Sequence, residues 1–303
     1  MAVVGGGLIG MSWASLLLAQ GLETVVVDPR PEAEAELKEF VAAAWSDLAE
    51  LGLTKSMEVM KAEFQTEISA LTGVDFVQEC GPDRIDVKHD LIRELETTLE
   101  KDVIIASSTS SLLASDIQAG AVQPDRILVA HPMNPPHVLP MVELVAGCQT
   151  SAATMDSAEA FYQSLHRVTI RVKKEVVGHL ANRLTSALYR EAVHIVAEGI
   201  ATVEDVDKAI TSGPGMRWAL MGPHLAYHLG GGKGGYRHYL DHLGATQEAR
   251  WREHGSPKLT EEVIELLIAG VEREIETQDE ITLASRRDAA LVEIAKIKKR
   301  YDF

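Results

Sequence analysis

The fold of this chain is decided by its opening stretch, Ala2-Val3-Val4-Gly5-Gly6-Gly7-Leu8-Ile9-Gly10. A short apolar run leads into the pattern G-x-G-x-x-G, and a helix-forming segment, residues 11–20, follows. In such a turn Gly5 permits the sharp bend, Gly7 lets the backbone approach a pyrophosphate, and Gly10 lets the helix pack closely on the strand. The helix N-terminus adds free N–H groups and the positive end of its dipole. The stretch therefore predicts a dinucleotide-binding turn.

Asp28 supplies the acidic partner that this turn requires. It ends the next apolar run, residues 24–28. A carboxylate at this point accepts hydrogen bonds from ribose hydroxyls and repels a 2′-phosphate, which favours NAD over NADP. Arg30 lies close enough to keep NADP as an alternative, and FAD uses the same fingerprint, although nothing else indicates a flavin domain. We expect NAD as the cofactor, bound by Gly5, Gly7, Leu8, Ile9, Gly10 and Asp28.

Short apolar runs alternate with helical segments over the first part of the chain. The expected strands are residues 2–4, 24–28, 75–78, 103–106, 127–130, 141–145 and 168–171. Most are almost continuously apolar, as is typical of strands covered on both faces. Beyond about residue 174 helical segments take over, interrupted by a glycine-rich stretch at 230–235 that predicts a flexible loop. We predict an α/β, Rossmann-like, doubly wound and mostly parallel sheet over residues 1–175, followed by a smaller all-helical domain over residues 176–303.

The composition limits which binding partners and which cellular compartment suit this chain. The 303 residues carry a formal net charge of −16, and an acidic surface repels phosphate backbones, so we expect no nucleic acid partner. No apolar run reaches membrane-spanning length, and the start lacks the basic residues of a signal peptide. We therefore expect neither a membrane-spanning segment nor a signal peptide. Cys80 and Cys148 are the only cysteines. A disulfide scaffold is therefore excluded, and a cytoplasmic location is expected.

Polar residues follow two of the expected strands. Ser107-Ser108-Thr109-Ser110-Ser111 comes after one strand, and His131-Pro132-Met133-Asn134-Pro135 comes after another. Ligands of open parallel sheets bind beyond the carboxyl ends of the strands, and a neutral imidazole beside hydroxyl and amide groups can deprotonate an alcohol. Glu143 interrupts an apolar run and requires a partner, which His131 can supply. Taken one at a time, His131 could be a structural histidine, the serine-rich segment an ordinary polar loop, and Glu143 an edge-strand residue that faces water. Taken together, these residues favour a catalytic site.

The order of these motifs resembles the 3-hydroxyacyl-CoA dehydrogenase superfamily over nearly the whole chain. The resemblance rests on the glycine turn, Gln78-Glu79, Lys88, the serine-rich loop, the His131 segment, Glu143 and Gly178-x-x-x-Asn182-Arg183. It implies that His131 is the general base and that Glu143 orients it. It implies that Ser110 and Asn182 hold the reacting oxygen, with Asn134 in support. Glu79 and Lys88 would lie near the nicotinamide end of the cofactor, and Ser108 joins the cofactor-binding set. A helical second domain that dimerises is also implied.

The second domain departs from the acyl-CoA members of that superfamily. Their closing G-x-G-F-Y-like segment is missing, and Gly213-Pro214-Gly215-Met216-Arg217-Trp218 stands before a longer charged tail. This arrangement resembles the branch that oxidises free hydroxy acids, such as the L-carnitine and L-gulonate dehydrogenases. An arginine fork binds a carboxylate through two hydrogen bonds, so Arg217 is the expected carboxylate site, with Trp218 beside it. A surface arginine in a loop is the alternative reading.

Together these features predict an NAD-dependent enzyme that oxidises the 3-hydroxyl of a small free L-3-hydroxy carboxylate, of the L-carnitine or L-gulonate type, to the 3-oxo acid. The alternatives are an acyl-CoA substrate and a non-catalytic, crystallin-like dinucleotide-binding protein. A trimethylammonium group could be held by an aromatic cage of Trp218, Tyr227, Tyr236 and Tyr239. The histidines at 224, 228, 238 and 242 lack an acidic partner at ligand spacing, so no metal is expected.

Overall fold

The computed structural model describes all residues from 1 to 303, which divide into two compact units. The units are Met1–Arg183 and Leu184–Phe303. The division falls within helix α6 (Ala181–Ala197), a few residues beyond the domain boundary expected after residue 175. The boundary between the two functional domains, expected between residues 175 and 176, stays a prediction.

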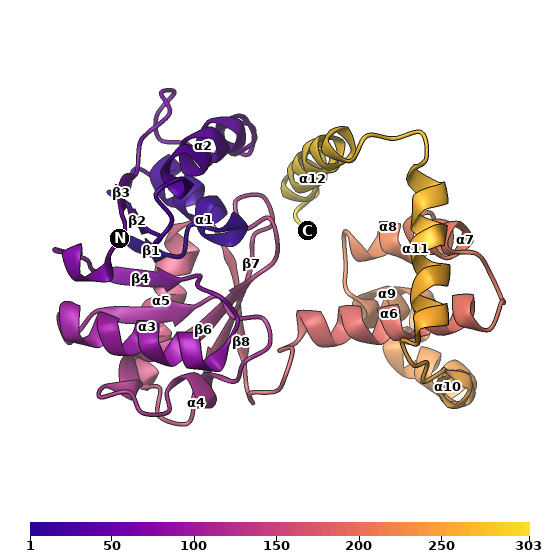
Figure 1. The fold of residues 1–303 in the computed structure, drawn as a ribbon. Helices are drawn as coiled ribbons and strands as arrows, with labels where there is room; N and C mark the ends of the chain where they lie inside the picture. Colours follow the sequence, from indigo (N-terminus) through magenta and orange to yellow (C-terminus); the bar gives the residue numbers. More distant parts are fainter. The chain divides into compact units, whose positions relative to one another are not determined.

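The first unit is built on one eight-stranded sheet with the order β3-β2-β1-β4-β5-β6-β7-β8 (Figure 1). The strands are β1 (Ala2–Val4), β2 (Val25–Val27), β3 (Glu63–Gln65), β4 (Phe76–Glu79), β5 (Ile104–Ser107), β6 (Ile127–Pro132), β7 (Met141–Ala146) and β8 (Val168–Val172). All neighbours pair in parallel except β6 and β7, which are antiparallel. The predicted mostly parallel, doubly wound sheet is confirmed. Strand β3 was missed because this edge strand is short and largely polar.

Helices cover both faces of this sheet. Helices α1 (Leu8–Ala19), α2 (Ala33–Glu50) and α5 (Ala152–Ser164) pack on one face, and α3 (Ile85–Thr98) and α4 (Ala114–Ile117) pack on the other. Short 3-10 turns lie at Ile68–Ala70 and Pro124–Arg126. Successive side chains of β1 point to opposite faces of the sheet, so they belong to two different core clusters. Val3 packs with Trp13 and Tyr162 on one face, and Val4 packs in the cluster of Ile92 on the other.

The strand order reverses between β1 and β4, and this reversal positions the ligand site. Strand β1 pairs with β2 on one side and with β4 on the other, so the crossover helices on its two sides cover opposite faces of the sheet. Ligands of doubly wound sheets bind in the crevice that this divergence opens at the carboxyl ends of the strands. The glycine turn follows β1 directly at this edge.

The second unit is entirely helical, as predicted. Its helices are the larger part of α6, then α7 (Val203–Thr211), α8 (Pro214–Trp218), α9 (Pro223–Gly230), α10 (Gly235–Glu253), α11 (Glu261–Ile275) and α12 (Glu280–Tyr301). The glycine-rich stretch predicted as a flexible loop is instead a 3-10 turn, Gly232–Gly234, between α9 and α10. Gly232 and Gly235 adopt positive φ angles there, which glycine tolerates without strain. None of the helices combines the length and the apolar character needed to cross a bilayer.

Candidate active site

The glycine turn between β1 and α1 has the geometry expected for a dinucleotide. Gly5 has φ +106°, and its N–H donates to the Val27 carbonyl at 2.8 Å. A Cβ on Gly10 would lie 1.8 Å from the Gly5 carbonyl oxygen, so helix and turn are in direct contact there. A Cβ on Gly7, at the start of α1, would meet no atom within 4 Å. The turn is thus closed behind Gly5 and Gly10 and open at Gly7, where a pyrophosphate would meet the helix N-terminus.

Asp28 follows β2 beside this turn. One carboxylate oxygen accepts the Gly6 N–H at 2.8 Å, and the other accepts the Arg30 N–H at 2.9 Å and Arg30 Nε at 3.1 Å. Arg30 also reaches Glu36, at 3.3 Å. Arg30 is therefore engaged by two carboxylates, and the acidic ribose position predicted from the sequence is intact. This arrangement fits NAD better than NADP.

Glu79 and Lys88 form a buried ion pair at the carboxyl end of β4. Lys88 Nζ donates to the two Glu79 carboxylate oxygens at 2.9 and 2.7 Å and to the Gly81 carbonyl at 2.9 Å. Ser107 Oγ and the Gly81 N–H also donate to this carboxylate, at 2.5 and 2.6 Å. Both charges are 1% exposed and fully satisfied, as buried ions require. Lys88 lines the pocket described below, whereas Glu79 is not among the lining residues.

The antiparallel pairing of β6 and β7 brings the predicted catalytic pair together. His131 lies directly opposite Glu143 in the register, and His131 Nδ1 lies 2.8 Å from Glu143 Oε2. Glu143 is fully buried, and its other oxygen accepts the N–H groups of Leu180 and Ala181 at 2.7 and 3.0 Å, at the start of α6. Because the carboxylate can only accept, Nδ1 donates to it, and in the neutral imidazole Nε2 is then the unprotonated nitrogen that can act as a base.

The hydrogen bonds of Glu143 keep it ionised in spite of its burial. Burial by itself raises the pKa of this carboxyl, but the hydrogen bonds from His131, Ala181 and Leu180 outweigh that effect, and the pKa lies below its ordinary value. The N-terminus of a helix also favours a negative charge. Glu143 therefore remains an anion beside the imidazole at neutral pH, as an orienting and charge-stabilising role requires.

The loop after β5 gathers three hydroxyl groups around Asp83, which the sequence analysis missed. Ser110 Oγ donates to Asp83 at 3.1 Å, Ser111 Oγ at 2.7 Å, and Thr109 Oγ1 forms a third contact. Burial opposes the ionisation of Asp83, yet these hydroxyls lower its pKa below the ordinary value. Asn182 Nδ2 donates to the Ser110 carbonyl at 3.3 Å. The signal for Asp83 was its place directly after the carboxyl end of β4, in Gly81-Pro82-Asp83.

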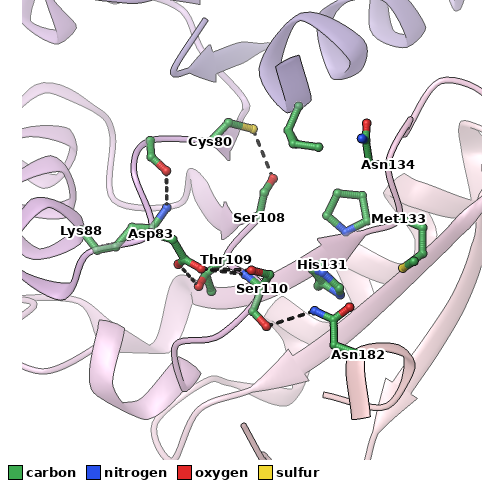
Figure 2. Close-up of a pocket in the computed structure, with 13 residues that line it drawn as sticks. Cys80, Asp83, Lys88, Ser108, Thr109, Ser110, His131, Met133, Asn134 and Asn182 are labelled. Atoms are coloured by element: carbon green, nitrogen blue, oxygen red, sulfur yellow. Dashed lines mark hydrogen bonds between the residues drawn. The ribbon is translucent and has the colours of Figure 1, made fainter. Parts of the chain in front are cut away.

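One cavity of about 360 Å³ connects most of these residues (Figure 2). Its walls include several predicted site residues: Ile9, Lys88, Ser108, Ser110, His131, Asn134 and Asn182. Figure 2 shows His131, Ser110 and Asn182 close to one another, with Asp83 beside Ser110 and Thr109 and with Lys88 and Cys80 further from His131. A hydroxyl group in this cavity would find a base and polar groups within one small volume, which is the arrangement that alcohol oxidation requires.

The predicted carboxylate site lies in the second unit. Arg217 and Trp218 are exposed on the short helix α8. Their role toward a substrate stays a prediction. Two candidates for the aromatic cage around a trimethylammonium group, Tyr227 and Tyr239, stack on each other at 4.5 Å with their planes only 10° apart. Rings at this spacing leave no room for a cation between them.

Comparisons with known proteins agree with this geometry. Residues 1–176 match the NAD binding domain of 3-hydroxyacyl-CoA dehydrogenase, and residues 178–274 match its C-terminal domain. The chain is 40% identical over 301 residues to the L-carnitine dehydrogenase of Streptomyces coelicolor, covering 99% of this chain and 95% of that protein. It is also 40% identical to the L-carnitine dehydrogenase of Pseudomonas aeruginosa, covering 100% and 96%.

A solved structure extends the agreement to the whole fold. The crystal structure of 5-formyl-3-hydroxy-2-methylpyridine 4-carboxylic acid 5-dehydrogenase, an NAD⁺-dependent dismutase, matches with a TM-score of 0.86 at 27% identity, over 98% of this chain and 97% of that one. The predicted NAD cofactor is confirmed at this level. The chain therefore belongs to the 3-hydroxyacyl-CoA dehydrogenase family and is an NAD-dependent oxidoreductase acting on a CH–OH group.

Proposed function

We propose that this enzyme oxidises the 3-hydroxyl of L-carnitine, a free 3-hydroxy carboxylate, to the corresponding 3-oxo acid. The observation that carries the proposal is the buried His131–Glu143 pair, whose imidazole faces a cavity shared with Ser110 and Asn182. The choice of L-carnitine is supported by relatives that bear that name and cover nearly the whole chain.

The residues of the cavity divide the chemistry between them. Bound NAD supplies the acceptor for the hydride that leaves the carbinol carbon. His131 Nε2 takes the hydroxyl proton, so that a C=O bond replaces the C–H and O–H bonds while the imidazole becomes cationic. Glu143 stabilises that cation through Nδ1. Ser110 and Asn182 hold the oxygen as it changes from hydroxyl to carbonyl, and Asn134 supports them in the same cavity.

The remaining predicted site residues complete this proposal. Glu79, Lys88 and Ser108 would lie near the nicotinamide end of the cofactor, with Lys88 and Ser108 in the cavity wall. Arg217 would bind the substrate carboxylate, with Trp218 beside it. On a chain of net charge −16 an arginine at the site also attracts the anionic end of the substrate.

The test measures NADH formation from NAD with L-carnitine, L-gulonate and 3-hydroxybutyryl-CoA in parallel. Turnover of L-carnitine alone is expected. Preference for L-gulonate would keep the chemistry and change the substrate, whereas turnover of the CoA ester alone would refute a free-acid enzyme. His131→Ala should abolish turnover and preserve NADH binding, and normal rates in this variant would refute the base. Arg217→Ala should raise KM for the free acid, and an unchanged KM would remove Arg217 from the site.

We also propose that the enzyme is a cytoplasmic homodimer that assembles through its helical unit. The buried apolar side chains among residues 184–303 are Val193, Val196, Val206, Tyr239 and Val292. Larger apolar side chains are exposed, among them Leu184, Leu225, Leu229, Trp251 and Leu266. Exposed apolar surface on this scale supports an interface with a second copy of the chain. Both cysteines are unpaired, which suits a reducing compartment. Light scattering after size-exclusion chromatography tests the dimer, and a monomer at micromolar concentration would refute it.

A further inference from the structure

His179 touches both halves of the catalytic machinery, yet neither the motifs nor the proposed reaction gives it a role. We propose that His179 is a positioning residue, which fixes the serine-rich loop against His131 as an uncharged imidazole. The proposal rests on the dehydrogenase function proposed above and deepens it. It concerns the turn Gly178-His179-Leu180, which leads into α6 at Ala181.

The contacts of His179 reach two separate strand ends. Its ring centroid lies 5.1 Å from that of His131, which belongs to β6, with the planes tilted by 45°. Its Nε2–H donates to the carbonyl oxygen of Thr109 at 3.3 Å, in the loop after β5. Thr109 directly precedes Ser110, the expected ligand of the substrate oxygen. One side chain thus contacts the base and the loop that presents the hydroxyl opposite it.

The same turn also holds the partner of the base. The N–H groups of Leu180 and Ala181, the two residues after His179, bind Glu143. Displacement of His179 would therefore move the Glu143 contacts together with the Thr109 contact. Reacting groups lose efficiency steeply when they are misplaced by as little as an ångström. A residue at this junction is in a position to set the distance between base and hydroxyl.

Two structural costs argue against a purely space-filling role for His179. Its backbone is left-handed, with φ +49°, a conformation that residues with a Cβ seldom adopt. Its Nδ1 is buried without a hydrogen-bond partner, and buried polar atoms are normally satisfied. A phenylalanine would fill the same space without an orphaned nitrogen. Nε2, which bonds to Thr109, is the part of the imidazole that a phenyl ring cannot replace.

The surroundings keep this imidazole uncharged. Burial is the main cause that lowers the pKa of His179, and His131 lowers it further, while the Thr109 contact, Glu143 and Asp83 oppose the shift. The carboxylate that could stabilise a cation is bonded to the other ring, since Glu143 Oε2 lies against His131 Nδ1. The proton released by the alcohol therefore belongs on His131, and His179 stays a neutral donor to Thr109 throughout the reaction.

The experiment compares His179→Phe with His179→Gln, and His166→Phe is the control. Phe keeps a ring but removes the donor, whereas the Gln amide nitrogen can take the place of Nε2 and restore the bond to Thr109. His166 is an exposed histidine that also has a positive φ, +58°, and it lies outside the cavity walls. We expect kcat to fall about 10-fold or more in His179→Phe while NADH affinity holds within about twofold. His179→Gln should recover most of kcat, and His166→Phe should match the parent enzyme.

Two kinetic outcomes would overturn the proposal. One is an unchanged kcat in His179→Phe. The other is an equal loss in the Phe and Gln variants, because the Thr109 bond would then be irrelevant. Failure of the unmutated enzyme to oxidise any of the three substrates would instead refute the proposed function. A measurement that needs no substrate tests the role of His179 even if the enzyme oxidises none of the three substrates or if a variant does not fold.

Nitrogen-15 NMR of the unmutated protein provides that measurement. We expect the His179 ring to be protonated at Nε2 alone, and to remain so as the pH falls through about 6.5, the ordinary pKa of histidine. Protonation at Nδ1, or a doubly protonated ring at neutral pH, would overturn the proposal whatever the activity.

Discussion

Glu143→Gln separates the charge of the catalytic pair from its shape. Glutamine is nearly isosteric, so the amide oxygen can still accept the N–H groups of Leu180 and Ala181. The amide nitrogen then faces His131 Nδ1, where the carboxylate oxygen lies at 2.8 Å. A donor at this position forces the imidazole proton onto Nε2, the nitrogen that should take the proton of the alcohol. The substitution therefore removes a stabilising anion and also fixes the wrong tautomer.

The expected loss follows from the geometry of this pair. Once His131 is protonated, its charge and the carboxylate are roughly 4 Å apart, and at an effective dielectric constant of about 20 their attraction is worth about 4 kcal/mol. Each 1.36 kcal/mol corresponds to about tenfold in rate, so the loss of charge alone lowers kcat by about 10³-fold. The unfavourable tautomer adds to this, and orienting carboxylates in comparable triads contribute about 10⁴-fold.

The assay is steady-state NADH formation from L-carnitine, with the NADH dissociation constant measured by fluorescence. The matched control is Glu159→Gln, which makes the same chemical change on α5, at an ion pair with Arg171 on the surface. We expect kcat to fall in Glu143→Gln alone, with NADH affinity preserved in both variants. A folded Glu143→Gln enzyme that keeps more than about a tenth of the parent kcat would refute the reasoning, because neither charge nor tautomer would then matter.

Three further outcomes are expected. Gly10→Ala should abolish NADH binding and destabilise the fold by about 3 kcal/mol, since its Cβ would lie 1.8 Å from the Gly5 carbonyl; calorimetry and NADH titration check this, and normal binding would contradict it. Asp28→Ala should raise KM for NAD about tenfold and improve the relative use of NADP, because the repelling carboxylate is gone and Arg30 keeps only Glu36 as a partner; unchanged cofactor kinetics would contradict it. The pKa of Glu143 is lowered by folding, so its contribution to stability is complete above the ordinary pKa of glutamate, about 4.3, and is lost as the pH falls below that value through the lowered pKa of the folded state. Urea unfolding should show a shallower acid loss in Glu143→Gln, and identical slopes would contradict it.

The sequence was sufficient for the first unit because its strands are buried on both faces. Continuous apolar runs such as Val25-Val26-Val27, bounded by turn residues, have few alternative readings. Strand β3 escaped because it is short, polar and at the sheet edge. The flexible loop predicted at residues 230–235 was wrong because a run of glycines suggests a loop, whereas here it makes a short 3-10 turn between α9 and α10. The glycines lie at the adjoining helix ends, where they cap or reverse the chain.

The catalytic pair was predictable because both members break a local rule. A histidine at a strand end and a carboxylate inside an apolar run each need an explanation, and pairing answers both. The sequence did not reveal how Glu143 is held. Its second oxygen is bound by two backbone N–H groups that lie 37 and 38 residues further along the chain, and backbone groups carry no side-chain signature.

Asp83 and His179 were missed for a related reason, and together they explain how the loop between them works. Asp83 binds the hydroxyls of Thr109, Ser110 and Ser111, and His179 binds the Thr109 carbonyl. Neither residue has to meet the substrate in order to matter. Each acts on the position of Ser110, and such an effect follows from the folded turn and not from the residue type. Motif analysis therefore finds the groups that perform the chemistry, whereas the groups that set their distances become visible only once β4, β5 and the turn before α6 converge at the same edge of the sheet.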